Sequence, residues 1–138
     1  MSWKELEHTG DLRLEIEAGT PEDLAIECAR AFYETSACLS IRGNGHGGEM
    51  QHLQVSSSGS DLAGLFAAWM NELLFFLETG HGVFYPETVR IDGQAGSLEA
   101  WGRWGPSPKP GGRVKAATYG GLEFDAGPPC RLRVTLDV

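Results

Sequence analysis

Two aspartates near opposite ends of the chain, Asp11 and Asp137, have the side chains best suited to bind a cation. Asp11 begins an alternating segment typical of a first strand, and Asp137 ends the last such segment, with only Val138 after it. If the two ends lie together, both side chains and the terminal carboxylate of Val138 converge, and their mutual repulsion needs a cation to offset it. Ca²⁺ or Mg²⁺ takes oxygen ligands of this kind. The alternative is that both aspartates are ordinary polar residues at strand ends.

The alternation of the two strands favours accessible carboxylates. Asp11 is out of phase with the apolar residues Leu12, Leu14 and Ile16, and Asp137 is out of phase with the apolar set of the last strand. Successive side chains of a strand point to opposite faces of the sheet. We therefore expect both aspartates to point away from the helix-covered face or to lie at its rim, where a cation can reach them.

Two further ionisable residues stand in apolar surroundings. Glu72 falls on the flank of the apolar stripe of the second predicted helix, and Lys115 is the only charged residue of the segment 114–119. Exposed charges are the rule in proteins, so a solvated acid at the helix rim and a solvent-facing lysine on an edge strand are the alternatives to a functional role.

Composition predicts one globular domain spanning residues 1–138. Hydrophobic residues make up 41% of the chain and charged residues 22%, which are ordinary values for a folded domain. The formal charge of −8 argues against tight direct binding of nucleic acid, whose affinity comes from Lys and Arg. The start of the chain lacks a signal-peptide pattern and its three cysteines lack paired spacing, so we expect a cytoplasmic protein with reduced thiols.

Periodicity predicts an α+β fold, with two helices packed on one face of a mainly antiparallel β-sheet. The second helix is too short and too interrupted by polar residues to span a membrane. Helices are expected from about Thr20 to Ser36, and from a cap at Ser60 to Thr79-Gly80. Strands are expected at about 11–17, 49–56, on both sides of the Asp92-Gly93 turn, at 114–119 and at 130–138. After a Gly120-Gly121 turn, residues 122–125 are expected either to pair back or to continue the edge strand.

Four blocks of the sequence, in this order and spacing, resemble the archease family. They are Leu6-Glu7-His8-Thr9-Gly10-Asp11, Trp69-Met70-Asn71-Glu72-Leu73-Leu74, Val114-Lys115-Ala116-Ala117-Thr118-Tyr119 and the ending Leu136-Asp137-Val138. The resemblance implies a small cytoplasmic accessory protein of an RtcB-type RNA ligase, which promotes guanylylation of that ligase and its multiple turnover. It also implies a divalent-cation site, usually with calcium, although Mg²⁺ or Mn²⁺ would also suit.

The resemblance places the cation ligands at Asp11, Asp137 and Val138, which are also the carboxylates suggested by the strand pattern. It further implies that Glu72 and Lys115 take part in ligase activation.

The chain departs from the family pattern at two glycines. Gly10 stands where an alanine is usual, and Gly120 where a histidine is usual. The second change removes an imidazole that could bind a metal or carry a proton.

Three functions fit these residues. The first is an accessory factor without catalysis of its own, which acts on a ligase that carries guanine nucleotide. The second is a stand-alone metal-dependent hydrolase with His8 as a base near the cation, since a metal site with an open position activates water; His8 could instead be a structural residue that bonds to the backbone. The third is a chaperone-like module that binds partners through exposed Phe75 and Trp101.

Overall fold

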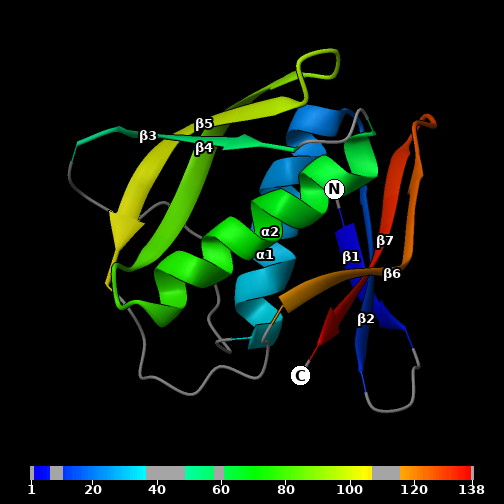
Figure 1. The fold of residues 1–138 in the computed structure, drawn as a ribbon, viewed down its shortest axis with the longest axis horizontal. Helices are drawn as coiled ribbons and strands as arrows, with labels where there is room; N and C mark the ends of the chain where they lie inside the picture. Colours follow the sequence, from blue (N-terminus) through cyan, green and yellow to red (C-terminus); the bar gives the residue numbers. More distant parts are fainter. Residues whose placement is uncertain (1, 7–10, 37–48, 58–60, 107–115, 138) are drawn as a thin grey trace.

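The computed structural model describes residues 2–6, 11–36, 49–57, 61–106 and 116–137, which form seven strands and two helices (Figure 1). In chain order these are β1 (Ser2–Leu6), β2 (Leu12–Ala18), α1 (Pro21–Ser36), β3 (Gln51–Ser56), α2 (Leu62–Glu78), β4 (Val83–Asp92), β5 (Ser97–Gly105), β6 (Ala116–Asp125) and β7 (Cys130–Asp137). In these parts of the chain, neither helix is long and apolar enough to cross a membrane.

The predicted α+β class is confirmed, but the described strands form two antiparallel sheets where the sequence suggested one. One sheet has the order β1-β2-β7-β6 and the other β3-β5-β4. The helices lie between them, with α1 contacting β2 and β4 and α2 contacting β6 and β3 (Figure 1). The physical reason is that α2 is buried around most of its circumference, from Gly64 to Leu74, and therefore needs a covering layer on more than one side.

Local signals explain where the helices begin and end. The Thr20 hydroxyl accepts a hydrogen bond from the Asp23 N–H at 3.1 Å, which confirms the expected start of α1. The cap of α2 is Asp61, whose carboxylate accepts from the Gly64 N–H at 2.8 Å, and not the predicted Ser60, which lies outside the described residues. A carboxylate suits this position because it faces the positive end of the helix dipole.

Two strands differ from their predictions. β1 was not predicted, because its five residues mix polar and apolar side chains without alternation, yet it pairs with β2 along its whole length. The segments on either side of the predicted Gly120-Gly121 turn are one continuous strand, β6, whose register with β7 is irregular between Thr118 and Glu123. Gly121 takes a positive φ of 72° there, which permits the irregularity without ending the strand.

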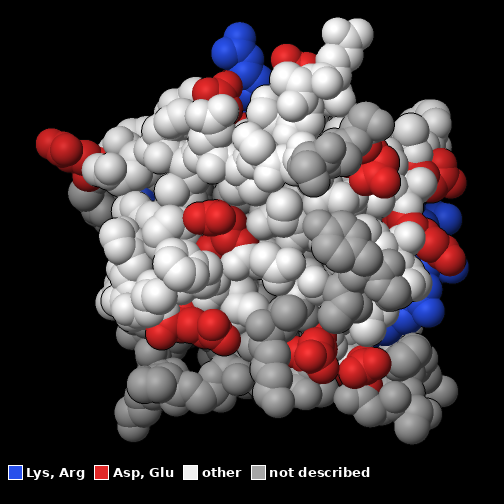
Figure 2. Space-filling view, in the orientation of Figure 1, with Lys and Arg blue, Asp and Glu red and all other residues white. Residues whose placement is uncertain are grey.

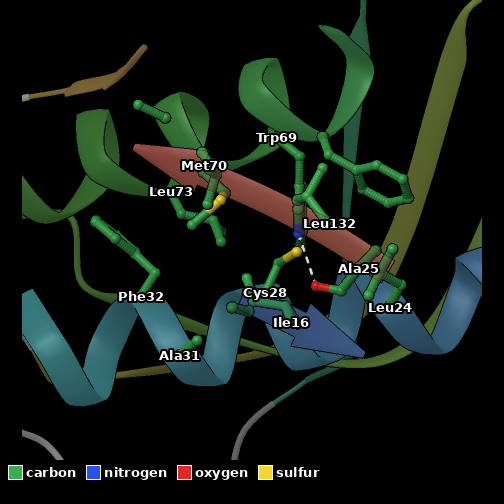
Figure 3. Packing of buried hydrophobic residues seen from close by; sticks show 14 of the residues in the cluster. Ile16, Leu24, Ala25, Cys28, Ala31, Phe32, Trp69, Met70, Leu73 and Leu132 are labelled. Atoms are coloured by element: carbon green, nitrogen blue, oxygen red, sulfur yellow. Dashed lines mark hydrogen bonds between the residues drawn. The ribbon is translucent and has the colours of Figure 1, made fainter. Parts of the chain in front are cut away.

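The core lies between the sheets and is tied together by two buried side-chain hydrogen bonds. The Trp69 indole N–H of α2 donates to the Ala25 carbonyl of α1 at 2.9 Å (Figure 3). The Phe84 N–H of β4 donates to the Tyr33 hydroxyl of α1 at 3.1 Å. Because an unpaired polar group in a core is costly, these two bonds set how α1 lies against α2 and β4.

The outer face of the β1-β2-β7-β6 sheet carries a network of ion pairs centred on Glu15. This carboxylate accepts from Arg133 Nε at 2.9 Å and lies 3.1 Å from Lys4 Nζ. The sequence placed Glu15 on the polar side of its strand, but the neighbouring strands cover it, so only 6% of the residue is exposed. The hydrogen bond from Arg133 and that from Lys4 lower the pKa of Glu15 below its ordinary value.

This lowered pKa predicts a stability contribution that depends on pH. A carboxylate whose pKa is lower in the folded state than in the unfolded state stabilises the fold at any pH above its unfolded-state pKa. This stabilisation is lost as the pH falls through the folded-state pKa. We expect Glu15→Gln to lower the denaturation midpoint at about pH 7 and to lose less stability than wild type between about pH 5 and about pH 3. The exposed Glu5→Gln is the control. Parallel stability curves for wild type and Glu15→Gln would contradict this assignment.

Candidate functional site

The pairing of β2 with β7 brings Asp11 and Asp137 to the same end of the sheet. Leu12 is paired with Leu136, Asp11 directly precedes Leu12, and Asp137 directly follows Leu136, so the two aspartates flank the last pair of this ladder. Leu12 and Leu136 face the core, and the two aspartates, one position away, therefore belong to the outer face, where Asp11 is half-buried and Asp137 exposed.

Strand β6 lies beside β7 at the same end of the sheet as Asp11 and Asp137. Asp137 is paired with Ala116, the first residue of β6. Lys115 precedes Ala116 directly in the sequence and lies outside the described residues, as do Val138 and His8. Gly120 lies within β6.

The side chain of Asn71 joins α2 to the start of β6. Its amide nitrogen donates to the Ala117 carbonyl at 3.1 Å, and its amide oxygen accepts from the Ala117 N–H at 2.7 Å. β6 is an edge strand, and the backbone groups of every second residue point away from the neighbouring strand. Asn71 therefore forms hydrogen bonds with both the N–H and the C=O of Ala117, as a neighbouring strand would. This role was not predicted from the sequence, where its only signal is an amide between Met70 and Leu73 in an apolar helix.

Glu72 follows Asn71 in α2 and is half-buried. Contacts between neighbouring segments thus connect the candidate residues. Asp11 and Asp137 flank the last pair of β2 and β7, Asp137 is paired with Ala116, and the Asn71 side chain, next to Glu72, bonds to the backbone of Ala117. The connection crosses the sheet edge, because the aspartates belong to the outer face while α2 covers the inner one.

The donor set suits a hard cation. Two carboxylates from adjacent strand ends offer oxygen ligands, which Ca²⁺ and Mg²⁺ prefer, and these ions complete their coordination with water or further oxygens. No group of three or more His, Cys, Asp or Glu residues that could hold a metal gathers anywhere in the described ranges, this end of the sheet included. Asp11 and Asp137 would hold the ion, whereas Val138, the third predicted ligand, lies outside the described residues.

A separate hollow lies at the β4–β5 hairpin. Its lining includes Arg90, Asp92, Gln94 and Glu99. None of the candidate residues lines it, and its mixture of charges indicates no single ligand. The half-buried Trp101 of β5 stacks beside His52, with ring centroids 4.9 Å apart, which corrects its prediction as an exposed aromatic.

The sequence model of the Archease protein family (MTH1598/TM1083) matches residues 3–138. The chain belongs to the archease family. A curated relative, the Protein archease of Methanopyrus kandleri, is 32% identical over 75 residues. That alignment covers 54% of this chain and 50% of the relative, so the chain spans about half the length of the curated archease that it matches.

Two solved structures share the archease fold with this chain. One is protein 1598 of Methanobacterium thermoautotrophicum, with a TM-score of 0.70 and 23% identity over 99% of this chain and 98% of that one. The other, from Thermotoga maritima, is described as an archease and possible chaperone; it has a TM-score of 0.61 and 22% identity, covering 98% of this chain and 96% of that one. At this identity the likeness shows the fold alone.

The Asn71 contact predicts a loss of stability on substitution. Asn71→Ala leaves the N–H and C=O of Ala117 without their partner, which costs about 1–3 kcal/mol for an unsatisfied buried group. Asn71→Asp keeps an acceptor for the N–H but places a carboxylate oxygen beside the Ala117 carbonyl, so it should also destabilise. Urea denaturation measures both, with Glu72→Gln as the neighbouring control. An unchanged midpoint for Asn71→Ala would show that this contact does not hold the strand edge.

Proposed function

We propose that this protein is an accessory factor that activates an RtcB-type RNA ligase by promoting its guanylylation and multiple turnover. The observation that carries the proposal is the series of contacts connecting Asp11, Asp137, Ala116 and the segment Asn71-Glu72. These contacts link the described parts of the segments through which the chain resembles archeases, from the end of the β2–β7 pair to α2. The partners are the ligase and the guanine nucleotide that the ligase carries.

Family membership and charge support an accessory role. The chain matches the archease model over nearly its whole length, and a relative in Thermotoga maritima is described as a possible chaperone, which by definition acts on another protein. The net charge of −8 disfavours direct binding of RNA, so recognition of the RNA is left to the ligase.

A divalent cation, calcium first and Mg²⁺ or Mn²⁺ as alternatives, is part of the proposal. Asp11, Asp137 and the carboxylate of Val138 would bind it with oxygen atoms, and the ion would supply positive charge that holds these acids together. Asp137 is paired with the start of β6, so a bound ion stabilises the strand that follows Lys115. Glu72, next to Asn71 in α2, and Lys115, which directly precedes β6 in the sequence, would supply one charge of each sign for contact with the ligase.

The cation site predicts a thermal shift that depends on two residues. A ligand that binds only the folded state stabilises it by about 2.7 kcal/mol at a hundredfold excess over its dissociation constant. For a chain of this size that is a rise of about 5–10 °C in the unfolding midpoint. We expect wild type to show this rise in calcium relative to EDTA, and Asp11→Asn and Asp137→Asn to lose it.

Calorimetric titration with calcium checks that the shift reports binding. Glu123→Gln, on the exposed part of β6, is the matched control and should bind as wild type does. The site assignment fails if wild type unfolds at one temperature in calcium and in EDTA, or if both aspartate variants keep the shift.

Ligase activation predicts a rate effect in a reconstituted reaction. Mixed with its cognate RtcB-type ligase, GTP and manganese, the protein should accelerate ligase guanylylation and allow multiple turnovers at substoichiometric amounts. Glu72→Ala and Lys115→Ala should reduce this acceleration, because each removes a charge from the proposed contact surface, while the fold persists. Gly120→His tests whether restoring the usual family residue increases it.

The same reaction separates the accessory role from catalysis. Without ligase, the protein should neither consume GTP nor cleave phosphoester substrates. Cleavage that His8→Ala abolishes would favour the metal-dependent hydrolase instead. Absence of any acceleration, with a ligase that is active by itself, would refute the proposal.

A further inference from the structure

Phe75 of α2 is an exposed aromatic side chain with a rigid support. It is 55% exposed, and Met50, at 45%, is the other large apolar residue exposed to a comparable extent in the described ranges. The Phe75 ring contacts Phe76 at a centroid distance of 5.5 Å. Phe76 in turn packs edge-on against Trp104 at 5.1 Å.

This support continues into the core. Trp104 contacts Phe84 at 5.1 Å, and Phe84 contacts the fully buried Trp69 at 6.4 Å. Ring contacts therefore extend from the exposed Phe75 to the centre of the fold. A side chain held in this way loses little conformational entropy when a partner covers it, which is the property of an effective anchor.

Acidic residues flank Phe75 on the same side of the helix. Glu72 and Glu78 stand three residues before and after it, a spacing that puts side chains next to one another on a helix surface. Glu78 lies in the last turn of α2, where a carboxylate opposes the helix dipole and so does not stabilise the helix. Helix stability therefore does not explain why this position carries an acid.

The surrounding surface has the same sign of charge. α2 contains no Lys or Arg between Leu62 and Glu78. Figure 2 shows acidic side chains spread over the face that α2 crosses in Figure 1, whereas the basic ones lie at its margin. A partner that covers this face must offset negative charge, which a phosphate backbone cannot do and a basic protein surface can.

We propose that Glu72, Phe75 and Glu78, the α2 docking face, bind a basic protein surface with an apolar pocket that receives the Phe75 ring. This inference rests on the proposed function, in which that protein is the RtcB-type ligase. To the proposed function it adds the element that contacts the ligase, helix α2, and the residue that anchors the contact, Phe75. Aromatic residues at the centre of an interface, surrounded by polar ones, commonly carry most of its binding energy.

Binding of the purified cognate ligase, measured by calorimetry or surface immobilisation, tests the docking face. Phe75→Ala should raise the dissociation constant about tenfold or more, and Phe75→Leu should raise it by less. Met50→Ala removes a similarly exposed apolar side chain elsewhere and should bind as wild type does. Glu78→Lys should weaken binding most at low salt, whereas Glu5→Lys, on the exposed strand β1, should have little effect.

Denaturation midpoints close to that of wild type show that the variants are folded. If Phe75→Ala does not fold, the binding of Phe75→Leu tests the docking face in its place. If wild type binds and activates the ligase and Phe75→Ala does both equally well, the docking face is wrong and the proposed function stands. If wild type neither binds nor activates the ligase, both are refuted.

Discussion

The antiparallel pairing of β2 with β7 is the constraint on which the rest of the structure depends. Its register places Leu12, Leu14 and Ile16 against the helices, and the same pairing brings Asp11 and Asp137 to one end of the sheet. A shift of one residue would expose the core side of both strands and separate the two aspartates. The packing of the core and the candidate cation site are therefore products of one set of backbone hydrogen bonds, which explains how a site can be built from residues at opposite ends of the chain.

Helix α2 connects that site to the core and to the surface. Trp69 bonds to α1 in the interior, Asn71 holds the edge of β6, and Phe75 projects from the exposed side. Asn71 and Phe75, four residues apart, lie on the same side of the helix, whereas Trp69, six residues before Phe75, lies on another side. A partner that binds the exposed side of α2 therefore contacts the same helix that bonds to β6, the strand that pairs with Asp137.

Sequence periodicity predicted the parts of the fold that rest on local patterns. β2, β7 and both helices follow from alternation, capping residues and apolar spacing, and the placement of Asp11 and Asp137 on the polar side of their strands follows from the same alternation. The division of the strands into two sheets was not predictable in this way, because it depends on how much of the helix circumference must be covered by elements distant in sequence.

Three further features of the structure could not be predicted from local sequence patterns. The contact of Asn71 with Ala117 joins residues 46 positions apart, and the burial of Glu15 depends on Arg133, 118 positions away. The continuity of β6 depends on its pairing with β7 across an irregular register. Each is a tertiary contact, for which propensity and spacing carry no signal.

Calcium titration of isotopically labelled protein, followed residue by residue through its backbone amide resonances, locates the cation. The largest shifts should occur at the amides of Asp11, Asp137 and Ala116 and diminish along β2 and β7 away from that end. Shifts concentrated instead at the β4–β5 hairpin, around Asp92 and Glu99, would show that Asp11 and Asp137 do not bind the ion.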